Sequence, residues 1–175
     1  MKKTLIPILA LLASIPFIGN AQSLPQLAAF GLNGHVRHCS FCSYDLGEGS
    51  FDRNGFILER DADKFIYNGK GQLIGYDGEK GQTILYYNRK GRLKKILSYD
   101  NGNPDTPTKR YYRYSKDGNV KSVKEFCKGK SLSYTSIKYL KFDGKGNWTK
   151  RDVTRTETSG KYEEIIQART IEYYD

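Results

Sequence analysis

The sequence predicts an all-β fold, an antiparallel meander of repeated β-hairpins forming a twisted sheet that is open or partly rolled. One seven-residue motif occurs five times: an aromatic residue, Asp, Asn or Ser, two largely polar residues, Gly, one further residue and an apolar one. After residue 34 no segment combines the apolar period and the capping residues of a helix. The five copies are Phe51–Ile57, Tyr67–Leu73, Tyr87–Leu93, Tyr114–Val120 and Phe142–Trp148.

Each copy of the motif predicts a tight turn between two strands. The short polar side chain at its second position can accept hydrogen bonds from the backbone, as at the first residue of a type I turn. The glycine three residues later can adopt the positive φ that closes a hairpin through a bulge. This register places the aromatic residue opposite the apolar one, a pair that stabilises a sheet by roughly 0.2–1 kcal/mol. The predicted turn glycines are Gly55, Gly71, Gly91, Gly118 and Gly146.

Between the copies, other turn signals return the chain for the next hairpin. They combine Gly with Asp, Asn, Ser or Lys, or pair two Asp residues, and they occur at 61–63, 77–81, 101–104, 128–130 and 159–160. We therefore expect about ten short strands from Phe51 onward. The copies are unevenly spaced, which an antiparallel meander tolerates better than a regular solenoid does.

The N-terminal segment, residues 1–21, is predicted to be a secretory signal peptide. A basic start precedes an apolar stretch from Leu5 to Ile18 that is short for a bilayer span, and small residues precede Gln22. A buried N-terminal helix is the alternative. We expect a periplasmic or extracellular protein whose mature chain has no transmembrane segment.

The mature chain is expected to form one domain. Residues 22–33 contain Pro25 and read as an N-terminal arm or a short helical turn, and residues 34–175 read as a single β-meander domain. The full sequence of 175 residues is basic, with a formal net charge of +10. Its 14 tyrosines are expected to supply much of the core. Because a tyrosine buries its ring but needs a partner for its hydroxyl, this composition suits a thin, amphipathic sheet.

The motif resembles the YD repeat, or Rhs repeat, of bacterial cell-surface and toxin-delivery proteins. The similarity covers residues 51–148, and Tyr173-Tyr174-Asp175 looks like a sixth copy that is cut off. Phe51-Asp52 and Phe142-Asp143 keep the Asp, whereas the other copies carry Asn or Ser. In large family members the repeats wrap around a toxic C-terminal domain. We expect no such domain after these repeats, so the resemblance implies a small exported member: an extracytoplasmic, β-rich, non-catalytic module.

The cysteines and histidines are candidates for a redox or metal site, but their spacing argues against one. In a strand, Cys39 and Cys42 would point to opposite faces, with Cα atoms about 10 Å apart. A zinc site would need further ligands, and Cys127 is the one other cysteine. We expect no metal and no cofactor, one of the first two cysteines as a candidate to pair with Cys127, and His35 and His38 as ordinary strand or surface residues.

No catalytic motif stands out, so we expect a protein without catalytic residues. The sequence has no Gly-x-Ser-x-Gly, His-Glu-x-x-His or P-loop pattern. Glu157, Glu163 and Glu164 could supply a carboxylate pair, which makes a glycoside hydrolase-like enzyme one alternative. Acidic residues on a polar strand are more often simply solvated.

The densest mixture of cations and rings is the predicted binding site. Rings stack on sugars and cations pair with phosphate or sulfate, so this chemistry suits an anionic glycan; the competing interpretation is that the rings form the core and the cations are solvated. In a strand, Tyr112 and Tyr114 share one face and Tyr111 and Arg113 the other. The candidate residues are Lys109, Arg110, Tyr111, Tyr112, Arg113, Tyr114 and Trp148.

These observations predict an exported, non-catalytic binding or structural module of the bacterial envelope. Its expected partner is an anionic glycan or another cell-surface polymer such as lipopolysaccharide. The first alternative is a protein-interaction module that pairs with another envelope protein through a sheet edge. Nucleic acid, which the same chemistry would bind, is not expected for an exported protein.

Overall fold

The computed structural model confirms the all-β fold. It describes residues 24–43, 47–58, 64–78, 81–101 and 103–175, and the predicted signal peptide lies outside these ranges. Within the described part of the chain, no helix has the length and apolar character needed to cross a bilayer.

Two antiparallel sheets and one short 3₁₀ helix, η1 (Pro25–Phe30), make up the fold. The three-stranded sheet has the order β12-β1-β2 and consists of β1 (Val36–Ser43), β2 (Gly47–Ser50) and β12 (Ile171–Tyr173). The nine-stranded sheet runs in sequence order through β3 (Lys64–Tyr67), β4 (Leu73–Gly78), β5 (Gly81–Tyr87), β6 (Leu93–Asp100), β7 (Asn103–Tyr114), β8 (Val120–Cys127), β9 (Lys130–Phe142), β10 (Trp148–Glu157) and β11 (Tyr162–Ala168). The meander therefore covers 64–168 rather than the whole of 34–175.

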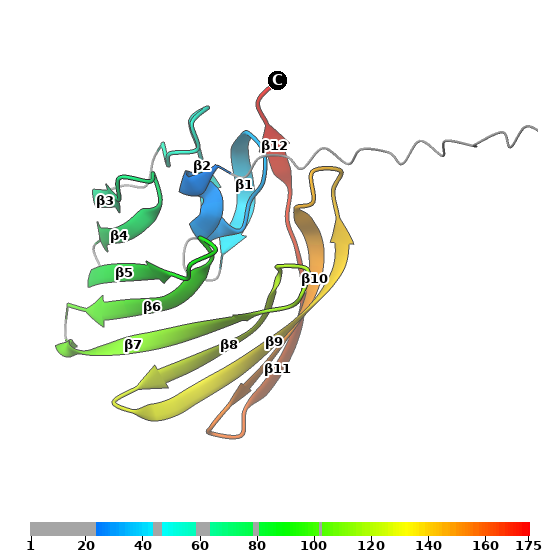
Figure 1. Ribbon diagram of the computed structural model, residues 1–175. Helices are drawn as coiled ribbons and strands as arrows, with labels where there is room; N and C mark the ends of the chain where they lie inside the picture. The colour runs from blue at the N-terminus through cyan, green and yellow to red at the C-terminus, as the bar shows by residue number, and fades with distance from the viewer. Residues whose placement is uncertain (1–23, 44–46, 59–63, 79–80, 102) are drawn as a thin grey trace, which may run out of the picture.

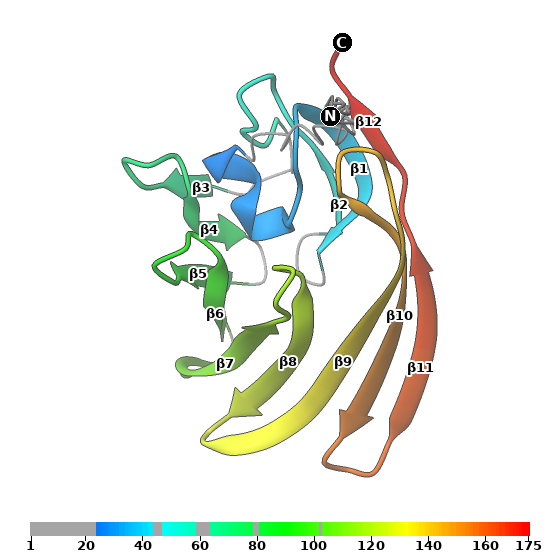
Figure 2. The same ribbon diagram turned by 45° about the vertical axis from the view of Figure 1, so that its right-hand side comes forward.

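The nine-stranded sheet curls into an open arc, with β3 and β11 as its end strands. Figures 1 and 2 show η1 and the three-stranded sheet on the concave side of this arc. Register shifts that mark bulges occur beside the motif turns, at Ile66/Tyr67, Tyr86/Tyr87 and Arg113/Tyr114. Because bulges bend a strand and increase its twist, they account for part of the curl. The concave side is called the inner face below, and the convex side the outer face.

All five motif copies form the predicted turn. In the third copy Asn88 Oδ1 accepts hydrogen bonds from the backbone N–H of Lys90 and Arg92 (2.9 and 3.1 Å), and Gly91 donates to the Asn88 carbonyl (3.0 Å). The five glycines have φ of 85°, 76°, 74°, 89° and 79°, which is the left-handed region. The aromatic and apolar residues face each other as predicted, in the pairs Phe51–Ile57, Tyr67–Leu73, Tyr87–Leu93, Tyr114–Val120 and Phe142–Trp148.

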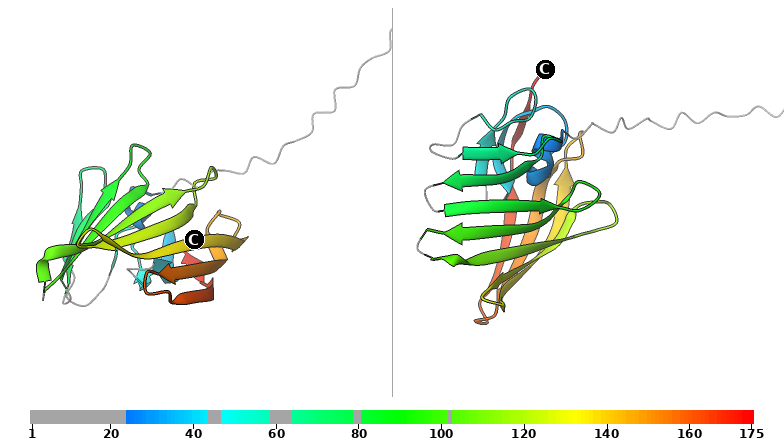
Figure 3. Two further views of the ribbon diagram at one scale, coloured as in Figure 1. Left: turned by 90° about the horizontal axis from the view of Figure 1, so that it is seen from below. Right: turned by 60° about the vertical axis from the view of Figure 1, so that its left-hand side comes forward.

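Because the strands alternate in direction, the motif turns between β3 and β4, β5 and β6, β7 and β8, and β9 and β10 all lie at one edge of the sheet. The side-by-side strands of its first half, coloured green, are clearest in Figure 3. The return turns occupy the opposite edge. We call the first edge the repeat edge.

Tyrosine hydroxyls join the third and fourth repeats to the repeat before each. Tyr87 Oη donates to the Leu73 carbonyl (2.5 Å), and Tyr114 Oη donates to the Leu93 carbonyl (2.6 Å). Burial raises the pKa of both hydroxyls well above the usual tyrosine value, so both stay neutral donors. Buried tyrosines therefore hold neighbouring hairpins together through hydrogen bonds from their hydroxyls to backbone carbonyls.

Tyr87→Phe is expected to lower the free energy of unfolding by about 1 kcal/mol, because it leaves the Leu73 carbonyl without this donor. Tyr86 on the outer face is 41% exposed, so Tyr86→Phe is the matched control and should have almost no effect. Urea unfolding of the two variants measures the difference. Equal stability of the two would contradict a structural role for the Tyr87 hydroxyl.

The short helical turn that was one expectation for residues 22–33 is present as η1, and it packs into the core. Leu27 and Phe30 of η1 are buried, and they belong to the same apolar cluster as Leu85 and Ile96 on the inner face. Phe30 packs edge-on against Phe51, with ring centroids 5.0 Å apart. η1 therefore packs against the inner face of β4–β6.

Asn147, which follows the glycine of the fifth motif copy, joins both ends of the described chain. It is 1% exposed, accepts a hydrogen bond from Asn33 N (2.7 Å), and donates to Asn33 O (2.9 Å) and to Tyr173 Oη (2.6 Å). Tyr173, predicted to begin a cut-off copy, lies instead in β12 opposite Val36.

The predicted pairing of a cysteine with Cys127 is wrong. Cys127 is a free thiol at the end of β8, and Cys39 is buried in β1. The strand conformation expected around Cys39 and Cys42 is present in β1, while the side chain of Cys42 lies outside the described part.

Candidate functional site

The stretch predicted as one site is divided between the two faces of the sheet. Tyr112 and Tyr114 line a cavity on the inner face. Lys109, Tyr111 and Arg113 alternate with them along β7 and are exposed on the outer face. The alternation of side chains along a strand makes this division unavoidable.

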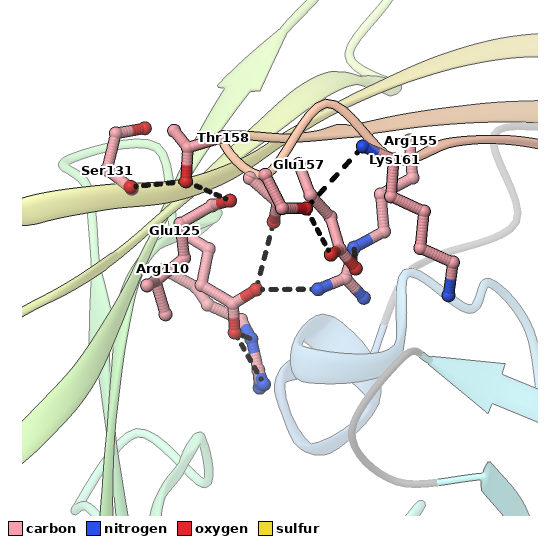
Figure 4. A network of polar contacts seen from close by, with 10 residues as sticks. Arg110, Glu125, Ser131, Arg155, Glu157, Thr158 and Lys161 are labelled. Atoms are coloured by element: carbon pink, nitrogen blue, oxygen red, sulfur yellow. Dashed lines mark hydrogen bonds and ion pairs between the residues drawn. The ribbon is translucent and has the colours of Figure 1, made fainter.

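Arg110, also on the inner face, takes part in a polar network near the return edge (Figure 4). Its guanidinium contacts Glu125 Oε1 through Nε and Nη2, both at 3.1 Å, while Arg155 Nη2 lies 3.2 Å from Glu125 Oε2. Ser133 Oγ donates a further hydrogen bond to Glu125 Oε2 (3.0 Å). The Glu125 side chain is 13% exposed, so Arg110 is committed to a half-buried Arg–Glu–Arg cluster and not to an external ligand.

Trp148 is also engaged within the protein. Its ring is 6% exposed, and the Cζ atoms of Arg151 and Arg169 lie 4.0 and 3.9 Å from the ring centroid. Arg169 Nε donates to the Trp148 carbonyl (2.7 Å), and Arg151 Nε donates to Gln167 Oε1 (2.7 Å). This arrangement stabilises two buried cations against an aromatic ring.

Seven residues on the outer face form a line that crosses seven strands. Each of these residues is the direct Cα partner of the next, from β5 to β11. Four of the seven are tyrosines, which are 41%, 40%, 43% and 61% exposed. We call this line the Tyr/Lys ladder. In strand order it consists of Tyr86, Lys95, Tyr111, Lys124, Tyr134, Thr156 and Tyr162.

Cations and rings of the ladder are in contact. Lys95 Nζ lies 4.0 Å from the centroid of Tyr86, and Lys124 Nζ lies 5.9 Å from that of Tyr134. Because neighbouring strands are about 4.8 Å apart, tyrosines on alternate strands recur about every 10 Å, and the whole ladder spans roughly 30 Å.

The central part of the ladder lies on a basic surface. Lys109, Arg113 and Lys138 are exposed beside it on the outer faces of β7 and β9. Carboxylates occur toward the β11 end, where Tyr162 Oη donates to Glu164 (3.0 Å). The positive section therefore covers β6–β9.

Two of the carboxylates considered for glycoside hydrolysis, Glu163 and Glu164, lie on opposite faces of the sheet. Where β11 pairs with β10, Glu163 lies opposite Arg155 and Glu164 lies opposite Thr154. Because neighbouring side chains along a strand alternate, Glu163 and Glu164 point to opposite faces of the sheet. Glu157 accepts a hydrogen bond from Ser159 Oγ (3.1 Å) in the following turn. Two carboxylates that flank a glycosidic bond must share one cleft, so Glu163 and Glu164 cannot form that pair.

The histidines contact neighbouring groups in the same part of the fold. His35 Nδ1 lies 3.0 Å from the Arg53 carbonyl, and His38 lies 3.2 Å from both Ser50 Oγ and Glu48. Among the residues that the structure describes, no group of three or more His, Cys, Asp or Glu side chains is arranged to hold a metal ion.

A scan against protein-family models and a search of curated proteins found no match for the chain. The function proposed below therefore rests on the geometry and chemistry of the described residues.

Proposed function

We propose that the protein is an exported, non-catalytic binding module of the bacterial envelope that recognises a linear anionic glycan. The observation that supports this is the Tyr/Lys ladder, in which exposed tyrosine rings and lysines alternate from β5 to β9 in one line across the outer face. A line of this kind suits an extended polymer better than a compact molecule.

Both components of the ladder match the chemistry of an acidic polysaccharide. A tyrosine ring offers an apolar face to a sugar ring and a hydroxyl to water, and a lysine pairs with carboxylate, sulfate or phosphate. The spacing of about 10 Å between tyrosines is comparable to the repeat of two sugar units in an extended chain. A polymer lying across the strands would therefore meet a ring at every such repeat, and a lysine between the rings from β5 to β9.

The experiment is titration of the protein with polygalacturonate by isothermal calorimetry, with neutral dextran as the uncharged control. The double variant Lys95→Gln/Lys124→Gln is expected to bind about tenfold more weakly, because each exposed cation contributes up to about 1 kcal/mol. Added salt should weaken binding by the unmodified protein more than binding by the variant, since salt screens exposed charges.

Lys70→Gln/Lys116→Gln is the matched control, because it removes the same charge from exposed turns of the repeat edge. Its affinity should stay close to that of the unmodified protein. An equal loss in both double variants would mean that net charge alone, and not the ladder, attracts the polymer.

Tight binding of single-stranded DNA in place of polygalacturonate would move the proposal from glycans to nucleic acids. In that case stacking of bases on Tyr111 and Tyr134 would carry the interaction.

The alternative of a protein-interaction module is favoured by β11, an end strand of the nine-stranded sheet. Its Ile165 and Ile166 are 41% and 55% exposed. A partner strand that pairs with this edge would cover them. Proline substitution at Ile166 would test this, because it would abolish such pairing without changing the ladder's cations.

A further inference from the structure

A second feature, on the opposite side of the sheet, lies outside the proposed glycan site. A cavity of about 510 Å³ is enclosed between η1 and the inner face of the arc. Small-molecule sites in proteins have volumes of about 300–1,000 Å³, so this one can hold a complete small ligand.

A large part of the cavity wall is aliphatic and aromatic. Its apolar side chains come from residues 28–32 and from β5, β6, β8 and β9, among them Phe30, Leu32, Leu85, Ile96, Val123 and Ile137. Tyrosine rings from β4, β7 and β9 add to the lining, those of Tyr76, Tyr112, Tyr114 and Tyr139. The polar lining residues include Asn33, Asn119 and Arg151, and the Arg151 guanidinium packs on the Trp148 ring.

The tyrosine hydroxyls give the walls little capacity to bind a polar ligand. Tyr114 Oη donates to the Leu93 carbonyl, and burial raises the pKa of Tyr114 and Tyr139. Both hydroxyls therefore stay neutral, and that of Tyr114 is already used within the sheet. A sugar would bury several hydroxyl groups against the aliphatic and aromatic part of these walls, where they would lack partners, which is unfavourable.

Charged side chains gather where the cavity meets the repeat edge. Lys90 and Arg92 come from the third motif turn and Asp117 from the fourth. The Arg92 guanidinium lies over the Tyr114 ring, with Cζ 5.6 Å from its centroid. Lys90 and Asp117 are exposed, so this edge of the cavity faces water and its described charges are predominantly positive.

We propose that the inner cavity binds a small amphipathic anion: one molecule with an apolar body and a single carboxylate. The body would lie against the aliphatic and tyrosine walls, and the carboxylate would lie near Lys90 and Arg92. Charge complementarity at the mouth and the apolar walls together select this occupant over a neutral apolar molecule or a sugar acid.

Three equivalent turn positions allow a matched test. In the second, third and fourth motif copies, the residue just before the glycine is Lys70, Lys90 and Asp117. Lys90 and Asp117 line the cavity, and Lys70 serves as the control. Lys90→Glu is expected to weaken anion binding about tenfold, and Asp117→Lys to strengthen it by a similar factor, through the change in local charge. Lys70→Glu should leave the affinity within about twofold, since screening removes its more distant charge.

The probe is anilinonaphthalene sulfonate, whose fluorescence rises in apolar surroundings, with decanoate as the competing carboxylate and glucuronate as the polar control. Displacement by decanoate but not by glucuronate, with opposite effects of Lys90→Glu and Asp117→Lys, is the expected result. No probe binding, displacement by glucuronate alone, or equal effects of Lys90→Glu and Lys70→Glu would overturn the proposal.

Val123→Trp gives a second, steric test, because its side chain would occupy the cavity that Val123 lines. Loss of probe binding in a variant that still unfolds cooperatively supports the site, and retained binding contradicts it. Polygalacturonate binding should be the same in Lys90→Glu and in the unmodified protein. The two sites lie on opposite faces, so failure of one proposal leaves the other standing.

Discussion

Trp148→Ala is expected to destabilise the protein by about 3–5 kcal/mol, the range for removal of a buried aromatic side chain. The loss has two sources. A cavity replaces a ring that is 6% exposed, and the guanidinium groups of Arg151 and Arg169 lose the aromatic surface on which they pack. Chemical unfolding followed by circular dichroism measures the change in the free energy of unfolding.

Two controls separate these sources. Trp148→Phe keeps a ring beside the guanidinium groups and should recover a large part of the stability. Tyr162→Ala removes an aromatic side chain that is 61% exposed on the outer face of β11 and should change stability little. If Trp148→Ala and Tyr162→Ala proved equally mild, Trp148 would not be a structural anchor.

Glu125→Ala is the second substitution with a large expected effect. It leaves Arg110 and Arg155 side by side without the carboxylate that both contact, at 3.1 and 3.2 Å. Removing one partner of a buried ion pair costs about 3–5 kcal/mol, and the partial exposure of this cluster places the expected loss at the lower end of that range. Thermal and urea unfolding both report it.

The replacement of all three charges gives the sharper result. A variant with Arg110→Met, Glu125→Met and Arg155→Leu removes the unpaired cations together with the carboxylate, and it should be more stable than Glu125→Ala. Glu164→Ala, on the exposed outer face, controls for the loss of a carboxylate in general. A triple variant less stable than Glu125→Ala would show that the cluster contributes net stability beyond charge balance.

The motif turns could be predicted because each depends on seven consecutive residues. Asn88 and Gly91, for example, form the turn with hydrogen bonds that join neighbours in the sequence. One more turn of this kind was recognised only as a return turn. Gly160 donates to the Glu157 carbonyl (3.0 Å) and has φ of 88°, but Thr156 stands where the motif has an aromatic residue.

The candidate site was predicted only in part. Period-two alternation is enough to separate Tyr112 from Tyr111, but it does not tell which of the two faces the interior. The packing of η1 against Leu85 and Ile96 makes that choice. The ladder from Tyr86 to Tyr162 also requires the register of six strand pairs, and each bulge or return turn can shift a register by one residue.

The order of the hairpins, the bend at each motif glycine and the ring beside it follow from the amino-acid sequence by itself, since short-range sterics and hydrogen bonds determine them. The extent of the curl, the pairing of β1 with β12 and the separation of the outer Tyr/Lys ladder from the inner cavity were decided by the tertiary structure. These features arise when residues distant in the chain bury one another's apolar surface, and no local pattern records which distant partner will provide that surface.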